Sequence, residues 1–417
     1  MSVFILLLFI FKKGKVAVLI IASFLFGVFY YQHFAELDFV LPLFEGREVE
    51  LTARVVDEES SHLEVKDFRD LELSERVAVY IDGDLKHGQV VKIKGEPNPI
   101  EGEFENHFHT ENVSVSFFDP EIKIVGNDYS LISYIYSARR SLGRRISRSS
   151  QFPESALLKA LLLGDRSSIP DSLQDRFSEI GIAHLLAVSG THIVIVSGII
   201  VSFISLLGIK FKYLLSIVFI SGFVLLVGAP ISAIRAGLIG SLFILAQKIG
   251  RKKNSSRGLI LIAFLMLLLN PRLLSGSVSF QLSFLAALGI SLFSGRLKSF
   301  LTEEKVVFKK SKINEIRNGL ARIFKRFSFL TDTLAVTLSA QIFTLPLIYY
   351  HFGNLPFLAP VSNLVIAPIV PVLMIVGFLS LLFSFIIPST LAFLPAYIIS
   401  TTTLFLTEIL HLACFLC

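Results

Sequence analysis

The sequence after residue 180 consists mainly of long apolar stretches separated by short polar loops. We expect eight membrane spans, at residues 182–208, 213–228, 231–248, 258–270, 273–294, 329–350, 357–384 and 387–413. A helix needs about 20 predominantly apolar residues to cross a bilayer. Hydrophobic residues make up 53% of the 417, and the mean hydropathy is +0.69. The chain is therefore predicted to be a mainly α polytopic membrane protein.

Two of these stretches are expected to be irregular. Residues 258–270 are too short to cross straight and are predicted to form a half helix. Pro360, Pro368 and Pro371 interrupt the stretch at 357–384. Discontinuous helices of this kind line cavities in membrane proteins.

Residues 1–31 are predicted to be an N-terminal membrane anchor. Only residues 16–31 approach a spanning length, and Lys12, Lys13 and Lys15 precede them. Positively charged flanks stay in the cytoplasm, so the residues that follow the anchor are expected outside. A cleaved signal peptide is the alternative, but no small-residue cleavage site follows the apolar stretch.

Residues 46–126 show the alternation of apolar and polar residues that is typical of β-strands. Apolar residues occupy every second position in residues 49–55, 77–81 and 91–93. Short strands of this number suit a five- or six-stranded barrel, for which the oligonucleotide-binding (OB) fold is one candidate. We expect a small all-β, OB-like extracytoplasmic domain.

Charge is divided unevenly along the chain. Residues 45–128 contain 21 acidic and nine basic residues, whereas the rest contains 12 acidic and 30 basic residues. A basic membrane body can hold polyanions, although contact with anionic lipids and topology signals explain the charge more simply. Single-strand binding by an OB barrel needs a positive groove with stacking aromatics, so the acidic domain is expected to serve assembly or gating.

Residues 129–150 contain five arginines and no acidic residue. At helical spacing, Arg140, Arg144 and Arg148 fall on one face, and Leu142 and Ile146 fall on another. The pattern predicts a basic amphipathic helix at the membrane interface. A multi-span domain is expected over residues 154–417, beginning with a short apolar helix, a break at 164–165 and a polar helix.

Residues 179–196 place His184, Ser189 and His192 in an otherwise apolar stretch. Polar groups inside a membrane are costly and usually functional. An intramembrane serine hydrolase is one interpretation, because His192 is one helical turn from Ser189 and could act as its base. A hydrogen bond from Ser189 to a carbonyl of its own helix is the commoner arrangement.

No metal, cofactor or catalytic residue is predicted. Cys414 and Cys417 form a lone CxxC, and the His107–His109 pair lacks the Asp and His of the nuclease signature that such a pair begins. The sequence also lacks a Gly-rich phosphate-binding loop with its lysine. We therefore expect a protein that is not an enzyme and that takes energy from a partner.

Several segments in order resemble the ComEC-type competence proteins, the inner-membrane channels for DNA uptake in natural transformation. They are residues 181–194, 229–236, 281–284 after Asn270-Pro271, and a closing group at 341–346, 351–353 and 362–368. Residues 46–126 fall where the family has an OB-like extracytoplasmic domain. Many members also carry a C-terminal metallo-β-lactamase-like domain, and the residues up to Cys417 do not include one. The resemblance therefore implies a channel and not a nuclease.

The resemblance implies a multi-pass protein of the bacterial cytoplasmic (inner) membrane that conducts single-stranded DNA. It also implies a cytoplasmic helicase-like ATPase and an extracytoplasmic DNA receptor as partners, and any nuclease would be a separate protein. A transporter of another polyanion or of a small metabolite is the alternative. A DNA strand needs a continuous wide path, whereas a metabolite needs one closed pocket at the midplane.

Polar residues of the spans are expected to converge on one water-filled path, because an arginine at the bilayer centre costs at least ~2.5 kcal/mol. Arg235, five residues after Pro230, is predicted to contact phosphate. The alternatives are a side chain that snorkels to the headgroups, or a pair with Asp332 or Glu408. The complete set of predicted path residues is His184, Ser189, His192, Arg235, Gln281, Gln341 and Asn363.

Overall fold

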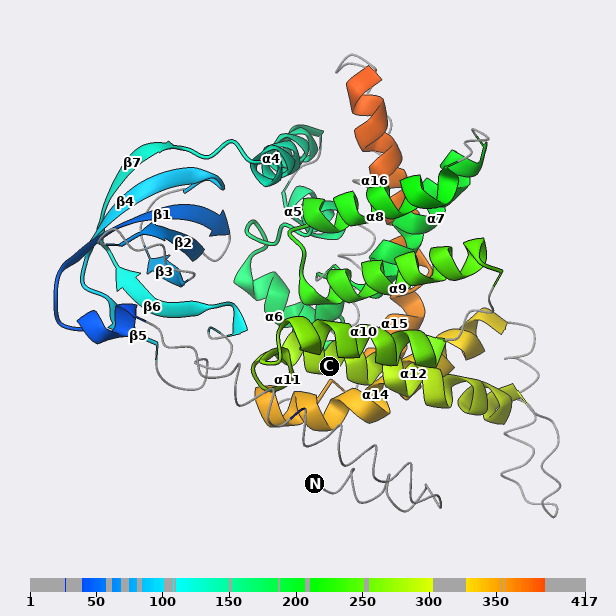
Figure 1. Ribbon diagram of the computed structural model, residues 1–417. Helices are drawn as coiled ribbons and strands as arrows, with labels where there is room; N and C mark the ends of the chain where they lie inside the picture. Colours follow the sequence, from blue (N-terminus) through cyan, green and yellow to red (C-terminus); the bar gives the residue numbers. More distant parts are fainter. Residues whose placement is uncertain are drawn as a thin grey trace. The chain divides into compact units, whose positions relative to one another are not determined.

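The computed structural model describes residues 27, 40–57, 62–68, 75–80, 85–100, 108, 110–149, 152–186, 188–206, 211–250, 255–302, 328–353, 355–356 and 358–386. Its contacts divide the chain into two compact units (Figure 1). The first contains Met1–Asn127 with Phe264–Val278, and the second contains Asp128–Ala263 with Ser279–Cys417. The predicted anchor (except residue 27), the span at 387–413, both cysteines, His107 and His109 lie outside the described residues.

The first unit is built on one β-sheet (Figure 1). A 3-10 turn, η1 (Leu41–Phe44), precedes its strands. The strands are β1 (Val49–Asp57), β2 (His62–Asp67), β3 (Arg76–Tyr80), β4 (Gln89–Gly95), β5 (Asn98–Pro99), β6 (Val113–Phe118) and β7 (Glu121–Asn127). Their order is β5-β6-β3-β2-β1-β4-β7, and only the β3–β6 pair is parallel.

The predicted alternation is confirmed, because the side chains of Val49, Leu51, Ala53 and Val55 are all buried in one core. The predicted closed barrel of five or six strands is not seen among the described strands. They form a seven-stranded sheet whose end strands, β5 and β7, are not paired with each other. β5 has two residues and one of them is Pro99, which lacks the N–H that a further ladder would need.

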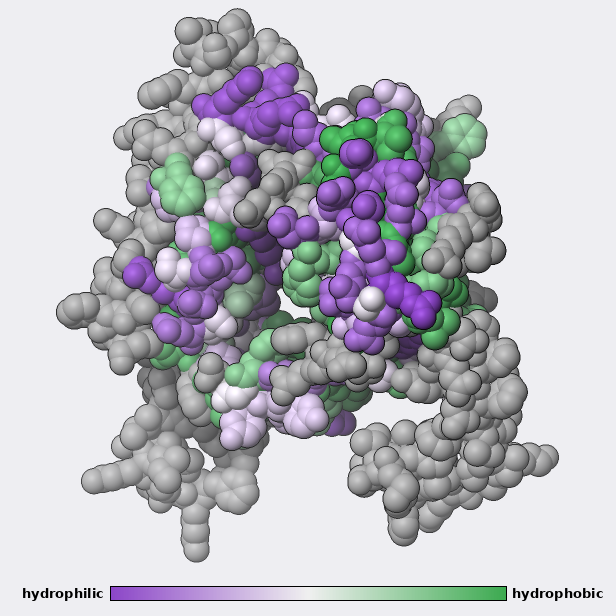
Figure 2. Space-filling model, turned by 90° about the vertical axis from the view of Figure 1, so that its left-hand side faces the viewer, coloured by the Kyte–Doolittle hydropathy of each residue, from purple (hydrophilic) through white to green (hydrophobic). Residues whose placement is uncertain are grey.

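Polar side chains pair across the outer surface of the strands. Lys92 Nζ lies 2.8 Å from Glu50 Oε1, and Lys94 Nζ lies 3.2 Å from Glu48 Oε1. Hydrophilic residues cover much of the described surface on the face in Figure 2. The strands thus place one apolar face in the core and the other in a polar surface, as a half-buried antiparallel sheet requires.

The first unit also holds a turn from the apolar part of the chain. Asn270 Nδ2 donates to the carbonyl of Thr110 at 3.0 Å, and Arg272 Nη1 lies 3.5 Å from Asn112 Oδ1. Arg272 is buried, and the short helix α11 (Leu273–Gly276) follows it. The turn is therefore attached to the residues just before β6.

The second unit is helical. Its helices are α4 (Leu131–Ser149), α5 (Glu154–Leu163), α6 (Asp171–Glu179), the 3-10 turn η2 (Ala183–Leu185), α7 (Gly190–Leu206), α8 (Lys212–Leu226), α9 (Ile231–Lys248), most of α10 (Ser255–Leu269), α12 (Val278–Thr302), α14 (Ser328–Phe352), α15 (Ala359–Ile366) and α16 (Ile369–Ile386). The predicted order of a short apolar helix, a break at Gly164 and a polar helix is confirmed by α5 and α6.

Four described segments are long and apolar enough to cross a membrane: Ala183–Ser202, Ile231–Lys248, Val278–Leu301 and Thr331–Phe352. α15 and α16 together make a possible fifth, bent by 42° at the break that contains Pro368. This break confirms the predicted discontinuity. α8 and α10 are apolar but shorter, and the 15 residues of α10 rise only about 22 Å.

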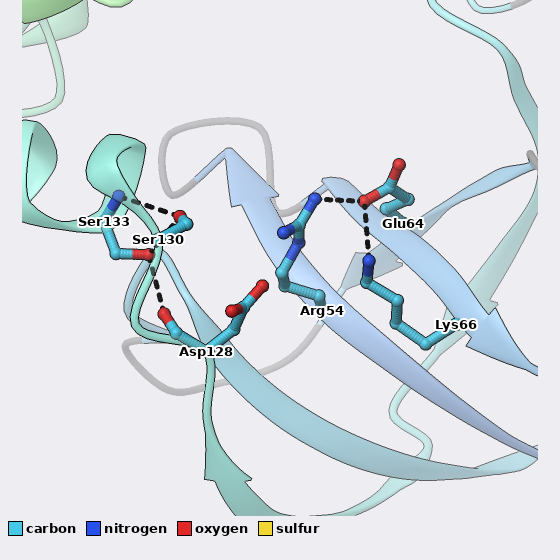
Figure 3. Close-up of polar contacts among 6 residues, drawn as sticks. All are labelled: Arg54, Glu64, Lys66, Asp128, Ser130 and Ser133. Carbon is cyan, nitrogen blue, oxygen red and sulfur yellow. Dashed lines mark hydrogen bonds and ion pairs between the residues drawn. The ribbon is translucent and has the colours of Figure 1, made fainter.

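The predicted amphipathic helix is α4, which starts at Leu131. Ser130 caps it, because the N–H of Ser133 donates to Ser130 Oγ at 3.2 Å, while Ser133 Oγ donates to the carbonyl of Asp128 at 2.8 Å (Figure 3). Arg144 and Arg148 are exposed. Arg140 is half-buried, and Ile146 on another face is buried, as the helical spacing predicts.

Candidate functional site

The start of α7 is defined by a reciprocal contact between Ser189 and His192. The N–H of Ser189 donates to His192 Nδ1 at 3.1 Å, and the N–H of His192 donates to the carbonyl of Ser189 at 3.1 Å. Ser189 Oγ lies 2.8 Å from the same Nδ1. A serine that precedes a helix and a side chain three residues later that bonds back to it form a capping arrangement. The helix therefore begins at Gly190, and Ser189 is not inside it as the sequence pattern indicated.

This geometry differs from that of a catalytic serine and histidine. A general base needs a nitrogen that is available for the hydroxyl proton and a third group that orients the ring. Nδ1 of His192 already accepts the backbone N–H of Ser189, and Nε2 is buried without a hydrogen-bond partner among the described residues. The pair acts as a helix cap. The alternative of a bond from Ser189 Oγ to a carbonyl of its own helix is also not what the structure has.

Helix α9 brings a second set of polar groups to the same place. Ser232 Oγ donates to the carbonyl of Val188 at 2.6 Å, which joins the first turn of α9 to the residues before α7. One turn further along α9, Arg235 Nη1 donates to the carbonyl of Ser283 in α12 at 2.6 Å. A Cβ added to Gly190 would lie 3.6 Å from Arg235 Nη2. Arg235 thus connects α7, α9 and α12.

We call this group the polar junction. The Cζ atom of Arg235 lies 5.6 Å from the ring centroid of Phe284, which gives the cation an aromatic contact as well. The guanidinium is half-buried, and its contacts to α7 and α12 hold it between helices rather than extended toward headgroups. The residues of the polar junction are Val188, Ser189, Gly190, His192, Ser232, Arg235, Ser283 and Phe284.

Arg235 lacks a counter-ion in the part of the chain that the structure describes. No carboxylate pairs with it there, and its Nε has no hydrogen-bond partner. Asp332 pairs instead with Lys298, whose Nζ lies 2.6 Å from Asp332 Oδ1. The alternative of an Arg235–Asp332 pair is therefore wrong, and Glu408 lies outside the described residues.

Two helix N-termini add positive partial charge to this cation. α7 begins at Gly190 and α9 begins at Ile231, and each N-terminus leaves backbone N–H groups without intrahelical partners. Pro230, the N-cap of α9, has no side-chain cap. A guanidinium between two positive helix ends, with no carboxylate of the described residues paired to it, has the chemistry to bind a phosphate or another anion.

The structure brings three of the seven predicted path residues together: Ser189, His192 and Arg235. Gln281 is on α12, two residues before Ser283. No hydrogen bond joins the side chains of His184, Gln341 or Asn363 to the polar junction within the described chain. His184 is exposed in η2, and Gln341 and Asn363 are half-buried in α14 and α15. Convergence of all seven on one path stays a prediction.

Sequence reasoning missed Ser232 and the backbone carbonyl of Ser283. A polar residue in the first turn of an apolar helix, two positions after Pro230, was the available signal for Ser232. A backbone carbonyl leaves no signal in the side-chain pattern.

Four basic side chains of the β-strands are paired with glutamates. Arg54 pairs with Glu64 of the next strand, and Lys66 Nζ lies 3.8 Å from the same carboxylate (Figure 3). The lysines of β4 are paired as well. In the described residues there is no group of three His, Cys, Asp or Glu side chains that could hold a metal ion.

Comparison with known proteins identifies a family for the helical part of the chain. Residues 161–416 match the family model described as competence protein. The chain is similar to ComE operon protein 3 of Bacillus subtilis (strain 168), with 24% identity over 214 residues. The alignment covers 51% of this chain and 24% of that protein's length. No solved structure matches significantly. The family match spans more than half of the chain and includes the polar junction.

Proposed function

Because the chain belongs to the competence protein family, we propose that it is a channel for single-stranded DNA in the cytoplasmic (inner) membrane of a bacterium. In this proposal the polar junction contacts the phosphates of the strand. The partners are those that the family resemblance implies: a cytoplasmic helicase-like ATPase that supplies energy, an extracytoplasmic DNA receptor, and a separate nuclease where one strand is degraded. The lipid bilayer surrounds the apolar helices.

The observation that carries the proposal is the uncompensated guanidinium of Arg235. A buried donor without a partner costs about 1 to 3 kcal/mol, so the site gains when an anion satisfies it. Nη1 is held by the carbonyl of Ser283, whereas Nε and Nη2 have no hydrogen bond among the described residues. A phosphate could accept hydrogen bonds from these donors. A guanidinium binds a phosphate better than an ammonium does, because its donors form a planar fork.

Charge in the loops supports an outer position for the polar junction. Residues 210–212, 251–257 and 296–326 are rich in lysine and arginine, which marks the cytoplasmic side. α7, α9 and α12 each end at one of these loops, so their N-terminal ends point to the outer side, with Ser189 just before α7 and Arg235 near the start of α9. Asn270, at the end of α10 away from the 251–257 loop, bonds to Thr110, in keeping with an extracytoplasmic β domain.

The β domain is assigned an assembly or gating role. Four of its basic strand side chains, Arg54, Lys66, Lys92 and Lys94, are paired with glutamates, which leaves these four poor phosphate contacts. The pairing of β1 with both β2 and β4, and the parallel β3–β6 pair, are compatible with a partly open OB-like barrel.

Substitution of Arg235 tests the proposal. In a naturally competent bacterium whose own channel gene is replaced by this one, Arg235→Ala should abolish uptake of labelled DNA, and Arg235→Lys should be intermediate, at normal protein levels. Lys248 lies exposed at the end of the same helix, so Lys248→Ala is the matched control and should leave uptake unchanged. Normal uptake by Arg235→Ala would refute a phosphate contact at this position.

Thiol accessibility separates the DNA channel from a transporter of a smaller anion. After both native cysteines are replaced by serine, single cysteines at Ser189, Gln281 and Asn363 should react with a water-soluble thiol reagent if one wide path includes all three. Protection of these positions, with small anions still transported, would favour the smaller substrate.

A further inference from the structure

The arginines of α4 have different surroundings. Arg144 and Arg148 are exposed, whereas Arg139 is half-buried, and its Nε donates to the carbonyl of Leu163 at 3.0 Å. Leu163 is the last residue of α5, where helix carbonyls lack intrahelical partners and carry negative partial charge. A cation is therefore favoured at this point, and the charge of Arg139 is compensated by the helix end.

The guanidinium of Arg139 also lies against Gly228, in the turn between α8 and α9. A Cβ added to Gly228 would lie 3.3 Å from Nη1, 3.7 Å from Cζ and 3.8 Å from Nη2 of Arg139. These similar distances show that the flat face of the group covers the glycine. Gly228 has φ +87°, so the turn also needs glycine for its backbone conformation.

Close contacts continue from this turn to the polar junction. Gly164, which directly follows α5, has so little room that a Cβ there would lie 2.8 Å from the carbonyl oxygen of Val227 and 2.9 Å from Val188 Cγ2. The carbonyl of Val188 accepts the hydroxyl of Ser232 in α9. The end of α5, the α8–α9 turn and the start of α9 therefore form one packed group, which Arg139 contacts at two places.

We propose that Arg139 is a positioning residue that fixes α4 to the end of α5 and to the α8–α9 turn, and so holds the first turns of α9, which carry Arg235, in place. Arg144 and Arg148 instead present their charge outward, to phosphate. The role of these two arginines rests on the proposed function, whereas that of Arg139 rests on its contacts alone.

Lysine should not replace Arg139. The contact with Leu163 uses Nε, close to the backbone, while the terminal nitrogens lie over Gly228. A lysine has one terminal nitrogen and no planar group, so it can make one of these contacts and not both. A residue that acts only through its charge would tolerate this exchange, which gives the proposal a discriminating test.

Amide hydrogen exchange on the purified protein in lipid nanodiscs provides the first measurement. Arg139→Gln and Arg139→Lys should both speed exchange at residues 163–165 and 227–232 roughly tenfold or more, since each loses at least one of the two contacts that the guanidinium makes. Arg144→Gln, on the same helix, is the matched control and should leave these amides unchanged. Unchanged exchange in both Arg139 variants would overturn the proposal.

The second measurement is the binding of a fluorescent single-stranded oligonucleotide at several salt concentrations. The slope of log affinity against log salt should fall by ~0.7 for each phosphate contact that is lost. Arg144→Gln and Arg148→Gln should each lower the slope, whereas both Arg139 variants should keep the wild-type slope. A lower slope in Arg139→Gln, restored by Arg139→Lys, would show a phosphate contact and overturn the positioning role.

The two measurements separate this proposal from the proposed function. If the wild-type protein does not bind the oligonucleotide, the DNA assignment fails, and hydrogen exchange still decides the role of Arg139. If Arg140, Arg144 and Arg148 are all changed to Gln and the oligonucleotide binds as before, their charge serves lipid headgroups instead.

Discussion

Gly181 gives a sharp test of how the segment before α7 packs. Its φ is +74°, and a Cβ at this position would lie 2.4 Å from Ala359 Cβ and 2.8 Å from Pro356 Cβ. Ala359 is the first residue of α15 and is buried. Gly181→Ala therefore places a methyl group where the start of α15 already lies.

The expected cost has two parts. A left-handed backbone costs a non-glycine residue about 1 to 2 kcal/mol. Overpacking adds about 1 to 3 kcal/mol, and here the atoms that are met are Cβ atoms, which cannot move away by a change of rotamer. Gly181→Ala should thus lower the free energy of unfolding by about 2 to 5 kcal/mol.

Gly250 and Gly353 separate the two parts. Their φ values are +73° and +67°, and nothing lies within 4 Å of a Cβ built on either. Gly250→Ala and Gly353→Ala should therefore show only the backbone cost of about 1 to 2 kcal/mol. The difference from Gly181→Ala measures the contact with α15.

Unfolding by SDS in mixed micelles, followed by circular dichroism, would measure these free energies. Ala359→Gly removes the atom at 2.4 Å, so the double variant Gly181→Ala/Ala359→Gly should regain part of the loss. We do not expect the stability to recover fully, because the contact with Pro356 and the cost of the left-handed backbone at residue 181 remain. If Gly181→Ala costs no more than Gly250→Ala, the packing of Gly181 on α15 is wrong.

Two further predictions concern the other helices and the β-strands. In α12, Gly289→Ala should destabilise the protein by about 1 to 3 kcal/mol more than Gly295→Ala. A Cβ at Gly289 would lie 2.3 Å from the carbonyl oxygen of Ser339 in α14, whereas Gly295 has open space around it. The SDS titration measures both variants, and equal costs would contradict the α12–α14 contact. In the sheet, hydrogen bonding and attraction from the Lys92 ammonium hold the pKa of the Glu50 carboxyl below its usual range. This pair therefore stabilises the fold at pH values above the ordinary carboxyl pKa, and the stabilisation is lost as the pH falls through the lowered pKa of Glu50. An NMR titration of the Glu50 carboxyl carbon should therefore give a higher pKa in Lys92→Gln than in the wild type, and an unchanged pKa would show that the pair does not form in solution.

Local sequence patterns predicted the strands and helices, but they did not predict how the strands pair or that the sheet stays open. The alternation at residues 49–55 predicted β1 because a strand repeats every two residues, and hydropathy located the helices because a span needs a long apolar run. Pairing of β3 with β6 joins residues 76–80 to residues 113–118, and no local pattern encodes it. The open edge at β5 follows from such long-range pairing and from Pro99.

The cap of α7 was missed for a related reason. A hydropathy window treats Ser189 and His192 as interruptions of one span, whereas the chain uses them to start a helix. The usual capping signature has Glu or Gln three residues after the serine, and here a histidine nitrogen takes that place. Arg139 was not singled out either, since helical spacing groups arginines by face and its partners come from other helices.

Arg139 and Arg235 both contact backbone carbonyls, but they differ in what surrounds the cation. Arg139 donates to the last carbonyl of α5, where the helix end supplies negative partial charge, so its charge is balanced within the fold. Arg235 donates to Ser283, inside α12, and stands beside the positive N-termini of α7 and α9. The environment of Arg139 stabilises a guanidinium without a ligand, whereas that of Arg235 is unfavourable for a cation unless an anion binds beside it. Electrostatics therefore favours a scaffold role for Arg139 and supports the proposed anion contact of Arg235, although the sequence presents both only as arginines in helices.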